Sequence, residues 1–427
     1  MDILMASSSI SVPRGTRDLA GEEAAAFVRL EEVSRKVFQL HKYSEVRTPV
    51  FESSELFKRS LGETSDVVEK EMFSFLDRGE REFSLRPEGT AGVVRYFLEN
   101  KLYLKGSYHR LFYSGPMFRA ERPQAGRYRQ FWQIGAEYFG DPEATADADT
   151  VFIVSRILSE FGIGDFTVQI NSLGCNNCRP KYKEALLQYL KGKEKLLSEE
   201  SLKRMKLNPL RVLDSKEDGP KLQDAPQMKQ FLCADCADKF RRFTGLLENS
   251  GFKFEENPKL VRGLDYYTGT VFEIVSPVLG AQNAVAAGGR YDNLVEFLGG
   301  PPTPAVGFAL GMDRVVEAHF LNREKTGVEK SLIDTCCVIP MTEEAVKLAF
   351  DLAQMLRHKG LAVPPVQSYK KKLKNQLSSA AEIGAKWAIL IGEDEIKAKY
   401  YSVKNLVTRE QSQVAQGQIF DFVMPTQ

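Results

Sequence analysis

Two strand-like segments separated by a polar loop restrict the fold of this chain more than any other feature. Residues 110–120 (RLFYSGPMFRA) and 130–140 (QFWQIGAEYFG) are rich in aromatic and aliphatic side chains. The loop at 121–129 is rich in Arg and also carries Gly and Pro. Two strands joined by such a loop form an antiparallel hairpin. We therefore expect an antiparallel sheet, preceded by a helix in the segment TAGVVRYFLEN (90–100).

The composition limits the class of protein and its partners. A chain of 427 residues exceeds the size at which one core usually stops growing, so we expect at least two domains. Lys plus Arg (58) nearly balance Asp plus Glu (57), so any RNA partner must be recognised by local sites and not by a globally basic surface. The N-terminus lacks the pattern of a secretory signal, and no apolar run approaches the length of a membrane span. We expect a soluble, cytoplasmic protein without a membrane partner; an organellar protein that has lost its transit peptide would share this pattern.

Changes in residue pattern divide the chain into domains. A first domain is expected over residues 1–320, interrupted by a helical insertion at about 172–256 that is rich in Lys, Leu and Glu. A polar stretch at 321–330 predicts a linker. In the last segment, 331–427, the strand-like runs TCCVIP, LAVPPVQ and KWAILIG alternate with helical patterns. This alternation predicts a small α/β domain with parallel strands.

The N-terminal region predicts a helix followed by a broken strand. Apolar residues recur at helical spacing in GEEAAAFVRLEEVSRKVFQLHKY. They are Phe27, Leu30, Val33, Val37 and Leu40. The next segment, SEVRTPVFE (44–52), has the composition of a strand but contains Pro49, which cannot donate a hydrogen bond to a sheet.

Four stretches combine Arg, Glu, Gly and aromatic residues at high density. They are residues 83–97, 113–140, 260–274 (LVRGLDYYTGTVFEI) and 286–316. Glycine lets the backbone approach a ligand closely, and the arginine fork matches phosphate or carboxylate. Together these stretches resemble the histidyl-tRNA synthetase family of class II aminoacyl-tRNA synthetases, from about Val12 into the C-terminal region.

The resemblance implies a fold and an activity. The fold would be an α+β catalytic domain, with an antiparallel sheet flanked by helices and a helical insertion, followed by an α/β anticodon-binding domain. The N-terminal helix and strand match the family motif that forms a homodimer interface, although a helix packing on its own core fits the pattern equally well. The activity would join histidine to tRNA(His), using ATP with Mg²⁺ and passing through histidyl-adenylate.

The resemblance also assigns the groups that bind ATP. Activation brings a carboxylate to the α-phosphorus of ATP, so catalysis must neutralise charge and align the reactants. By resemblance, Arg119 and Arg262 contact the α-phosphate and are the catalytic pair, while Arg127 and Arg314 hold the distal phosphates. The same resemblance stacks Phe131 on adenine and gives Glu121 to the nucleotide and its Mg²⁺. The chain contains no P-loop.

The amino-acid pocket must recognise an ammonium group and an imidazole. For the ammonium, the resemblance assigns Glu88, Thr90 and Gln133, which offer a carboxylate and neutral acceptors. Glu88 could equally serve only as a favourable charge at the start of the following helix. For the imidazole, it assigns Glu137 to one ring nitrogen and Tyr267 to the other, with Tyr266 completing the wall.

Two rival functions remain open on the sequence. One is a catalytically inactive, synthetase-like regulatory subunit of ATP phosphoribosyltransferase; the other is an RNA-binding module. Regulatory subunits of the first kind generally lack some of the phosphate-binding arginines and also lack the C-terminal domain. This chain retains Arg119, Arg127, Arg262 and Arg314 and continues for about a hundred residues beyond them. The RNA-binding alternative leaves the pocket motifs unexplained.

Four of the six cysteines form two CxxC pairs, Cys175/Cys178 and Cys233/Cys236. Two such pairs can hold one zinc ion through four thiolates. The separation between the pairs is much longer than in ordinary zinc ribbons, and the family does not require a metal. The sequence leaves two alternatives: a structural Zn²⁺ site or four reduced thiols. The basic run SYKKKLKN (368–375) is either a solvated surface or a contact for tRNA phosphates.

Overall fold

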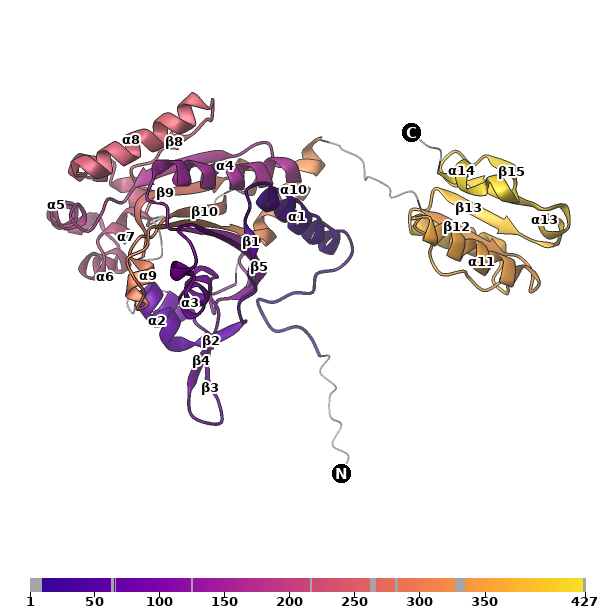
Figure 1. Ribbon diagram of the computed structural model, residues 1–427, viewed down its shortest axis with the longest axis horizontal. Helices are drawn as coiled ribbons and strands as arrows, with labels where there is room; N and C mark the ends of the chain where they lie inside the picture. The colour runs from indigo at the N-terminus through magenta and orange to yellow at the C-terminus, as the bar shows by residue number, and fades with distance from the viewer. Residues whose placement is uncertain are drawn as a thin grey trace. The chain divides into compact units, whose positions relative to one another are not determined.

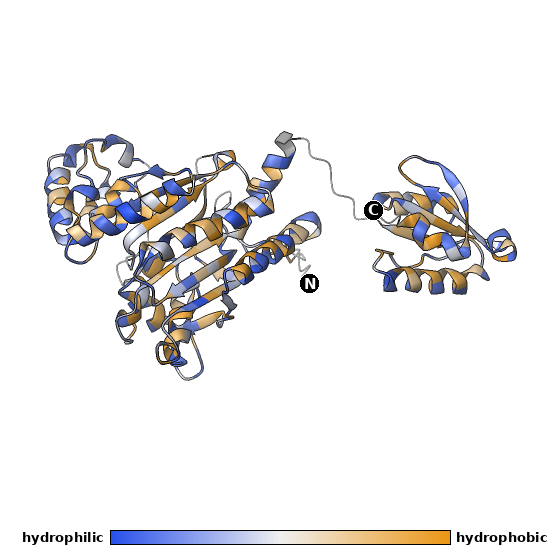
Figure 2. Ribbon diagram, turned by 45° about the horizontal axis from the view of Figure 1, so that its top comes forward, coloured by the Kyte–Doolittle hydropathy of each residue, from blue (hydrophilic) through white to orange (hydrophobic). Residues whose placement is uncertain are grey.

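The chain consists of two compact units, residues 1–326 and 327–427 (Figure 1). The computed structural model describes residues 10–62, 65, 67–123, 126–215, 217–261, 266–280, 283–326 and 335–424. Each unit has a hydrophobic core of its own. In Figure 2, hydrophobic residues concentrate on the strands, while the helices carry both hydrophobic and hydrophilic residues.

The first unit is built on a large mixed sheet. Within the described residues, eight strands follow the order β1-β5-β6-β11-β10-β9-β7-β8. Their bounds are β1 Ser44–Glu45, β5 His109–Phe118, β6 Gln130–Phe139, β7 Thr167–Ser172, β8 Glu255–Glu256, β9 Thr268–Val275, β10 Ala284–Arg290 and β11 Ala305–Gly311. The inner pairs are antiparallel, as the sequence predicts, but β1 pairs with β5 and β7 with β8 in parallel. The edge strands β1 and β8 have only two residues each, which is too short to be recognised from hydrophobic periodicity.

The predicted hairpin is formed by β5 and β6. Its register runs from His109 opposite Phe139 to Phe118 opposite Gln130. Because side chains alternate across a strand, Ile134 and Ala136 enter the core on one face of the sheet, whereas Gln133 and Glu137 project from the other. The hairpin therefore separates an apolar core from a polar site.

Helices cover both faces of this sheet (Figure 1). The first face carries α1 Gly21–Leu40, α4 Ala144–Phe161, α8 Ala234–Asn249 and α10 Met312–Thr326. The second face carries α2 Ser54–Leu61, α3 Thr90–Glu99 and α9 Leu294–Phe297. On the first face, the fully buried Phe38 of α1 stacks on Phe112, with ring centroids 4.4 Å apart. Truncating such a ring to alanine costs about 3–5 kcal/mol.

The N-terminal region follows the sequence pattern with one exception. Leu40, the last residue of α1, was expected on the apolar face of the helix but is 57% exposed. As predicted, the strand pattern at 44–52 is broken at Pro49; its parts, β1 and β2 Phe51–Ser53, belong to different sheets. The smaller sheet has the order β2-β4-β3, with β3 at Ser74–Leu76 and β4 at Glu82–Leu85.

The segment between β7 and β8 is helical. It contains α5 Arg179–Lys191, α6 Glu199–Leu207, α7 Leu210–Leu213 and α8. The first three helices surround a small core of their own that includes Tyr182, Leu186 and Leu190. In contrast, α8 places Phe243 and Leu247 in the main core beside α4. The helical segment therefore packs on the main core of the first unit through α8.

The second unit is a four-stranded sheet with helices. Its strands, β12 Cys336–Pro340, β13 Trp387–Ile391, β14 Tyr400–Asn405 and β15 Gln411–Ala415, are adjacent in that order. Its helices are α11 Ala345–His358, α12 Leu373–Glu382, α13 Glu393–Ala398 and α14 Ile419–Val423.

The prediction of three parallel strands in this unit was wrong in two respects. The run LAVPPVQ forms only an isolated bridge between Thr335 and Ala362, because Pro364 and Pro365 lack the N–H groups that a strand must donate. Only β12 and β13 are parallel, while β13, β14 and β15 pair antiparallel. No helix in the described part of the chain is both long and apolar enough to cross a membrane.

Candidate active site

A polar pocket of about 200 Å³ opens on the second face of the large sheet. Its floor is formed by β6, β10 and β11, and small residues of β10 and β11 leave space above the backbone. The six residues predicted to bind histidine all line it, together with Arg119; they are Glu88, Thr90, Gln133, Glu137, Tyr266 and Tyr267. The hairpin, α3 and the segment before β9 thus bring residues from distant parts of the sequence into one cavity.

Glu88 occupies the N-terminus of α3. Its carboxylate accepts hydrogen bonds from the backbone N–H groups of Thr90 (2.6 Å) and Ala91 (2.8 Å). Burial raises the pKa of Glu88, while these two hydrogen bonds act in the opposite direction. The helix-terminal role considered for Glu88 is therefore realised, and the same carboxylate also lines the pocket.

Glu137 is the most deeply buried acid of the pocket, with 1% of its surface exposed. Thr90 donates its hydroxyl hydrogen to Oε1 (2.7 Å), and Tyr291 donates to Oε2. Burial raises the pKa of Glu137 to about 8; the Glu88 charge adds to this rise, and the two hydroxyl donors oppose it. Glu137 lies opposite Gly307 of β11, where any Cβ atom would overlap its carboxylate. Position 307 therefore requires glycine if Glu137 is to keep this orientation.

Three tyrosines and Gln133 form much of the remaining pocket wall, which also includes Glu273 and Arg119. The rings of Tyr266 and Tyr267 lie 4.8 Å apart, and Tyr266 meets Tyr291 edge-on at 5.7 Å. Gln133 lies four residues before Glu137 on the same face of β6, and its buried Oε1 has no hydrogen-bond partner among the described residues. A cationic ligand would supply the donor that this oxygen lacks.

Arg119 connects the pocket to a second group of charged residues. Its Nε donates to the carbonyl of Pro87 (3.0 Å), and its guanidinium lies 5.2 Å from the ring centroid of Phe131. The carboxylate of Glu121 lies 3.8 Å from Arg119 and 3.1 Å from Arg127. One acid thus holds two of the predicted phosphate-binding cations beside the predicted adenine-stacking ring.

Arg314 enters the same region from the start of α10. Both burial and the positive charge of Arg127 lower the pKa of the Arg314 guanidinium. Two like charges gathered at one place favour an anion between them. The neighbouring Asp313 fixes this end of α10, because it accepts hydrogen bonds from Arg17 (2.7 Å) and from the backbone N–H of Trp132 (2.8 Å).

Two residues outside the predicted set, Tyr291 and Arg290, help to form the site. Arg262 lies outside the described residues. Tyr291, which the sequence analysis did not single out, contacts Glu137 directly; its position in the Gly- and Arg-rich stretch 286–316 was the available signal. Arg290, just before it, makes a buried ion pair with Asp147 of α4 (2.6 Å). This pair fixes the end of β10, from which Tyr291 reaches the pocket.

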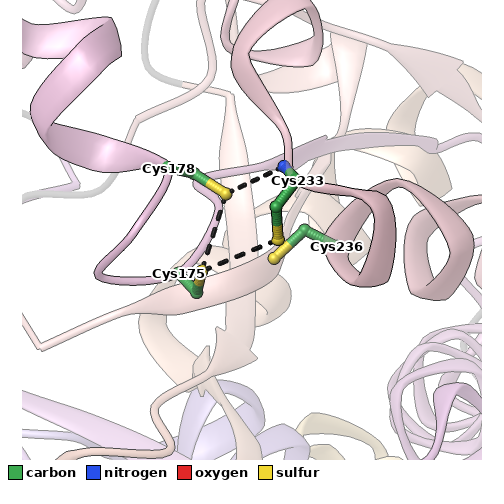
Figure 3. A group of neighbouring side chains, drawn as sticks. All are labelled: Cys175, Cys178, Cys233 and Cys236. Carbon is green, nitrogen blue, oxygen red and sulfur yellow. Dashed lines mark hydrogen bonds between the residues drawn. The ribbon is translucent and has the colours of Figure 1, made fainter.

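The two CxxC pairs also come together. The candidate ligand atoms of Cys175, Cys178, Cys233 and Cys236 all lie within 4.8 Å of one another (Figure 3). All four are free cysteines. The fold of the helical segment therefore brings the two pairs together although they are far apart in the sequence.

The pocket and its surroundings have complementary chemistry. Two buried carboxylates and a free amide oxygen suit a ligand with positively charged and neutral N–H groups. The adjacent arginines suit an anion with several oxygens. A mixed sheet with this pair of sites, followed by a separate α/β unit, defines a class II aminoacyl-tRNA synthetase.

Comparison with known proteins identifies the family. The sequence model of the histidyl-tRNA synthetase family matches residues 15–315, and that of an anticodon binding domain matches residues 335–424. The chain belongs to the histidyl-tRNA synthetase family.

Individual relatives match over almost the whole chain. A histidine–tRNA ligase of Aquifex aeolicus is 48% identical over 409 residues, which cover 95% of this chain and 98% of the relative. A histidine–tRNA ligase of Endomicrobium trichonymphae is 44% identical, with 94% and 97% of the two chains covered. The crystal structure of apo S. aureus histidyl-tRNA synthetase superposes with a TM-score of 0.79 at 32% identity, covering 97% of this chain and 99% of the other.

Proposed function

We propose that this protein is an aminoacyl-tRNA ligase that activates histidine with ATP and transfers it to the 3′ end of tRNA(His). The observation that carries the proposal is the pocket, in which two buried carboxylates and three tyrosines adjoin a group of arginines. The family membership and the ligase names of relatives at 40–48% identity support the same activity.

The ammonium group of histidine would lie among Glu88, Thr90 and Gln133. Gln133 Oε1, which has no hydrogen-bond partner among the described residues, offers one acceptor, and Glu88 provides the opposite charge. Although Glu88 already accepts two backbone N–H groups, a carboxylate offers about four lone-pair sites. A cation bound here would also favour the ionised forms of both buried acids.

The imidazole would lie between Glu137 and Tyr267, with Tyr266 as the adjoining wall. Thr90 and Tyr291 fix both oxygens of Glu137 in place before a ligand arrives, so the acceptor is preorganised. An amino acid without a ring N–H would leave this buried carboxylate one hydrogen bond short. That penalty would provide selectivity without an editing domain.

ATP would bind with its α-phosphate near Arg119 and Arg262 and its distal phosphates near Arg127 and Arg314. The histidine carboxylate attacks the α-phosphorus, a P–O bond forms to the acyl oxygen, and pyrophosphate leaves. Arg119 suits the role of neutralising charge at the α-phosphate because it lines the histidine pocket and also lies beside Glu121, at the place proposed for the phosphates. Phe131 offers its ring to adenine beside Arg119.

Glu121 is the residue that would hold Mg²⁺. Its carboxylate faces Arg119 and Arg127, at the place proposed for the phosphates. Mg²⁺ usually binds through one or two carboxylates together with substrate phosphates, so a single acid fits the requirement. When bound, the ion supplies further charge neutralisation for the phosphates.

In the transfer step, a ribose hydroxyl of tRNA attacks the carbonyl carbon of the adenylate, an ester forms and AMP leaves. None of the four histidines lines the described pocket, so no imidazole is placed to accept the hydroxyl proton. We assign that role to a phosphate oxygen of the adenylate itself. The second unit would bind the anticodon region, with exposed lysines between 370 and 374 contacting tRNA phosphates.

The proposal includes a cytoplasmic homodimer. The exposed rings of Phe51 and Phe75 pack together on one face of the small sheet, and Phe51 belongs to the segment that carries the predicted interface motif. Exposed apolar patches of this kind mark interaction surfaces. A cytoplasmic location suits a ligase that supplies protein synthesis and a chain whose six cysteines are free.

Pyrophosphate exchange with each of the twenty amino acids tests the activity directly. Only histidine should support exchange, and the purified enzyme should then charge tRNA(His). A protein that binds histidine but supports no exchange would instead be the regulatory subunit. Exchange with a different amino acid would contradict the assignment of Glu137 and Tyr267.

A further inference from the structure

We infer that Cys175, Cys178, Cys233 and Cys236 bind one Zn²⁺ ion that fastens the helical segment to the catalytic sheet. The four side chains converge from two elements that are far apart in the sequence (Figure 3). The inference concerns the architecture of the segment and does not depend on the proposed ligase activity.

The sulfur positions match a single tetrahedral ion. Zn–S bonds of about 2.3 Å in a tetrahedron place the sulfurs about 3.8 Å apart. Here Cys175 Sγ lies 3.5 Å from Cys178 Sγ and 3.9 Å from Cys233 Sγ. No pair in the cluster exceeds 4.8 Å. Four sulfurs gathered this closely surround one ion, and thiolate ligands in tetrahedral arrangement favour zinc.

The local backbone is arranged to support thiolates. Cys178 immediately precedes α5, and Cys233 immediately precedes α8, so both pairs lie at helix N-termini, where the helix dipole favours negative charge. The backbone N–H of Cys233 donates to Cys178 Sγ across the cluster (3.1 Å). Gly174, just before the first pair, has φ +61°, and a Cβ there would clash with the side chains of Met228 and Cys178. Only glycine allows the backbone at position 174 to pass this close to the side chains of Met228 and Cys178.

The cluster lies where the small core of the helical segment meets the start of α8. Cys178 leads into the small core of α5–α7, whereas Cys236 lies in the first turn of α8, which packs on the main core. Because a bound ion would crosslink these two elements, its binding energy would contribute to the stability of the segment.

The loop that carries the first pair also contacts residues that follow two of the pocket tyrosines. Gly174 accepts a hydrogen bond from Gly269 of β9 (3.0 Å), two residues after Tyr267. Asn176, between the two cysteines, accepts one from Asn293 (3.2 Å), two residues after Tyr291. The loop that would hold the ion is therefore hydrogen-bonded close to both Tyr267 and Tyr291 in the sequence. We expect loss of the ion to weaken histidine binding as well as to lower thermal stability.

The first experiment measures metal in wild-type protein prepared under reducing conditions without chelators. Elemental analysis should find about one zinc per chain. Zinc released by a thiol-modifying reagent should appear in the same amount, and Co²⁺-substituted protein should show the absorption of tetrahedral thiolate cobalt. No zinc, or iron in its place, would overturn the inference, as would a disulfide within the cluster.

Substitutions then assign the ligands. Cys233→Ser should lose the zinc and lower the Tm by about 5 °C or more. The matched control is Cys337→Ala, because Cys337 lies in β12 outside the cluster; it should keep one zinc per chain. If Cys233→Ser does not fold, the zinc content and the cobalt absorption of the wild-type protein still test whether the cluster binds zinc. Undiminished zinc in folded Cys233→Ser would overturn the ligand set.

Discussion

The active-site pocket and the basic run of the second unit use charge in opposite ways. Glu88 and Glu137 are 4% and 1% exposed, and both are fixed by hydrogen bonds from neighbouring groups. Lys370, Lys371 and Lys372 are exposed and lie before α12. A buried charge interacts strongly with its neighbours and tolerates few changes, whereas exposed charges act additively and are screened by salt. Substitutions in the pocket should therefore have large individual effects, and those in the basic run small cumulative ones.

The largest effect is expected for Arg262→Ala. Its guanidinium is proposed to neutralise charge that develops at the α-phosphate, an interaction stronger in the transition state than in the ground state. Single-turnover adenylate formation should fall about a hundredfold or more, while equilibrium histidine binding changes much less. Arg262→Lys should restore little, because an ammonium cannot reproduce the planar fork. Equal adenylation rates in wild type and both variants would remove Arg262 from the mechanism.

Glu137→Ala should weaken histidine binding by about 1–3 kcal/mol, since it removes the acceptor of an imidazole nitrogen. Isothermal calorimetry measures this effect. Glu31→Gln is a suitable control, because Glu31 accepts a hydrogen bond from Ser114 on the opposite face of the sheet. Histidine affinity unchanged in Glu137→Ala, or lowered equally in the control, would show that the pocket has been assigned incorrectly.

The comparison becomes sharper when the three lysines are replaced together. Lys370→Ala, Lys371→Ala and Lys372→Ala combined should weaken tRNA binding by about tenfold and flatten its dependence on salt, because each phosphate contact contributes to that slope. Histidine-dependent pyrophosphate exchange should not change. Lys347→Ala, at an exposed lysine of α11 paired with Asp351 (2.7 Å), is the control. If the salt dependence of tRNA binding is unaltered in the triple variant, the basic run is a solvated surface and does not contact tRNA phosphates.

The smallest effect concerns stability and pH. The pKa of Glu137 is raised to about 8 from an ordinary value near 4.5, so between these values the folded protein holds a proton that the unfolded chain has released. Stability from this group therefore falls as the pH rises through that window. Glu137→Gln does not titrate, so its Tm relative to wild type should rise by about 2 °C or more between pH 5 and pH 9. A difference independent of pH would contradict the raised pKa.

The hairpin and the dense motif stretches show how far sequence reasoning reaches. The alternation in β5 and β6 depends only on neighbouring residues, so the antiparallel pair could be predicted. The resemblance also supplied the six pocket residues, which the fold brings into one cavity. Their proposed roles in binding histidine and ATP still await the experiments described above.

Other features depend on contacts that no local pattern encodes. The edge strands β1 and β8 exist only because a neighbouring strand lies beside them, and the sheet of the second unit is mixed because β14 and β15 add to it antiparallel. Tyr291 was overlooked because its role is defined by Glu137, which lies 154 residues away in the sequence. The same holds for the pairing of Arg290 with Asp147.

The sequence by itself determined the class of fold and the residue types that the chemistry needs, because these follow from local periodicity and from motifs. Only the tertiary structure decided that Gly307 makes room for Glu137, that Thr90 and Tyr291 fix its oxygens, and that two distant CxxC pairs form one cluster. The physical reason is that burial, hydrogen-bond partners and sulfur–sulfur distances are properties of three-dimensional neighbours. Chain order does not specify them.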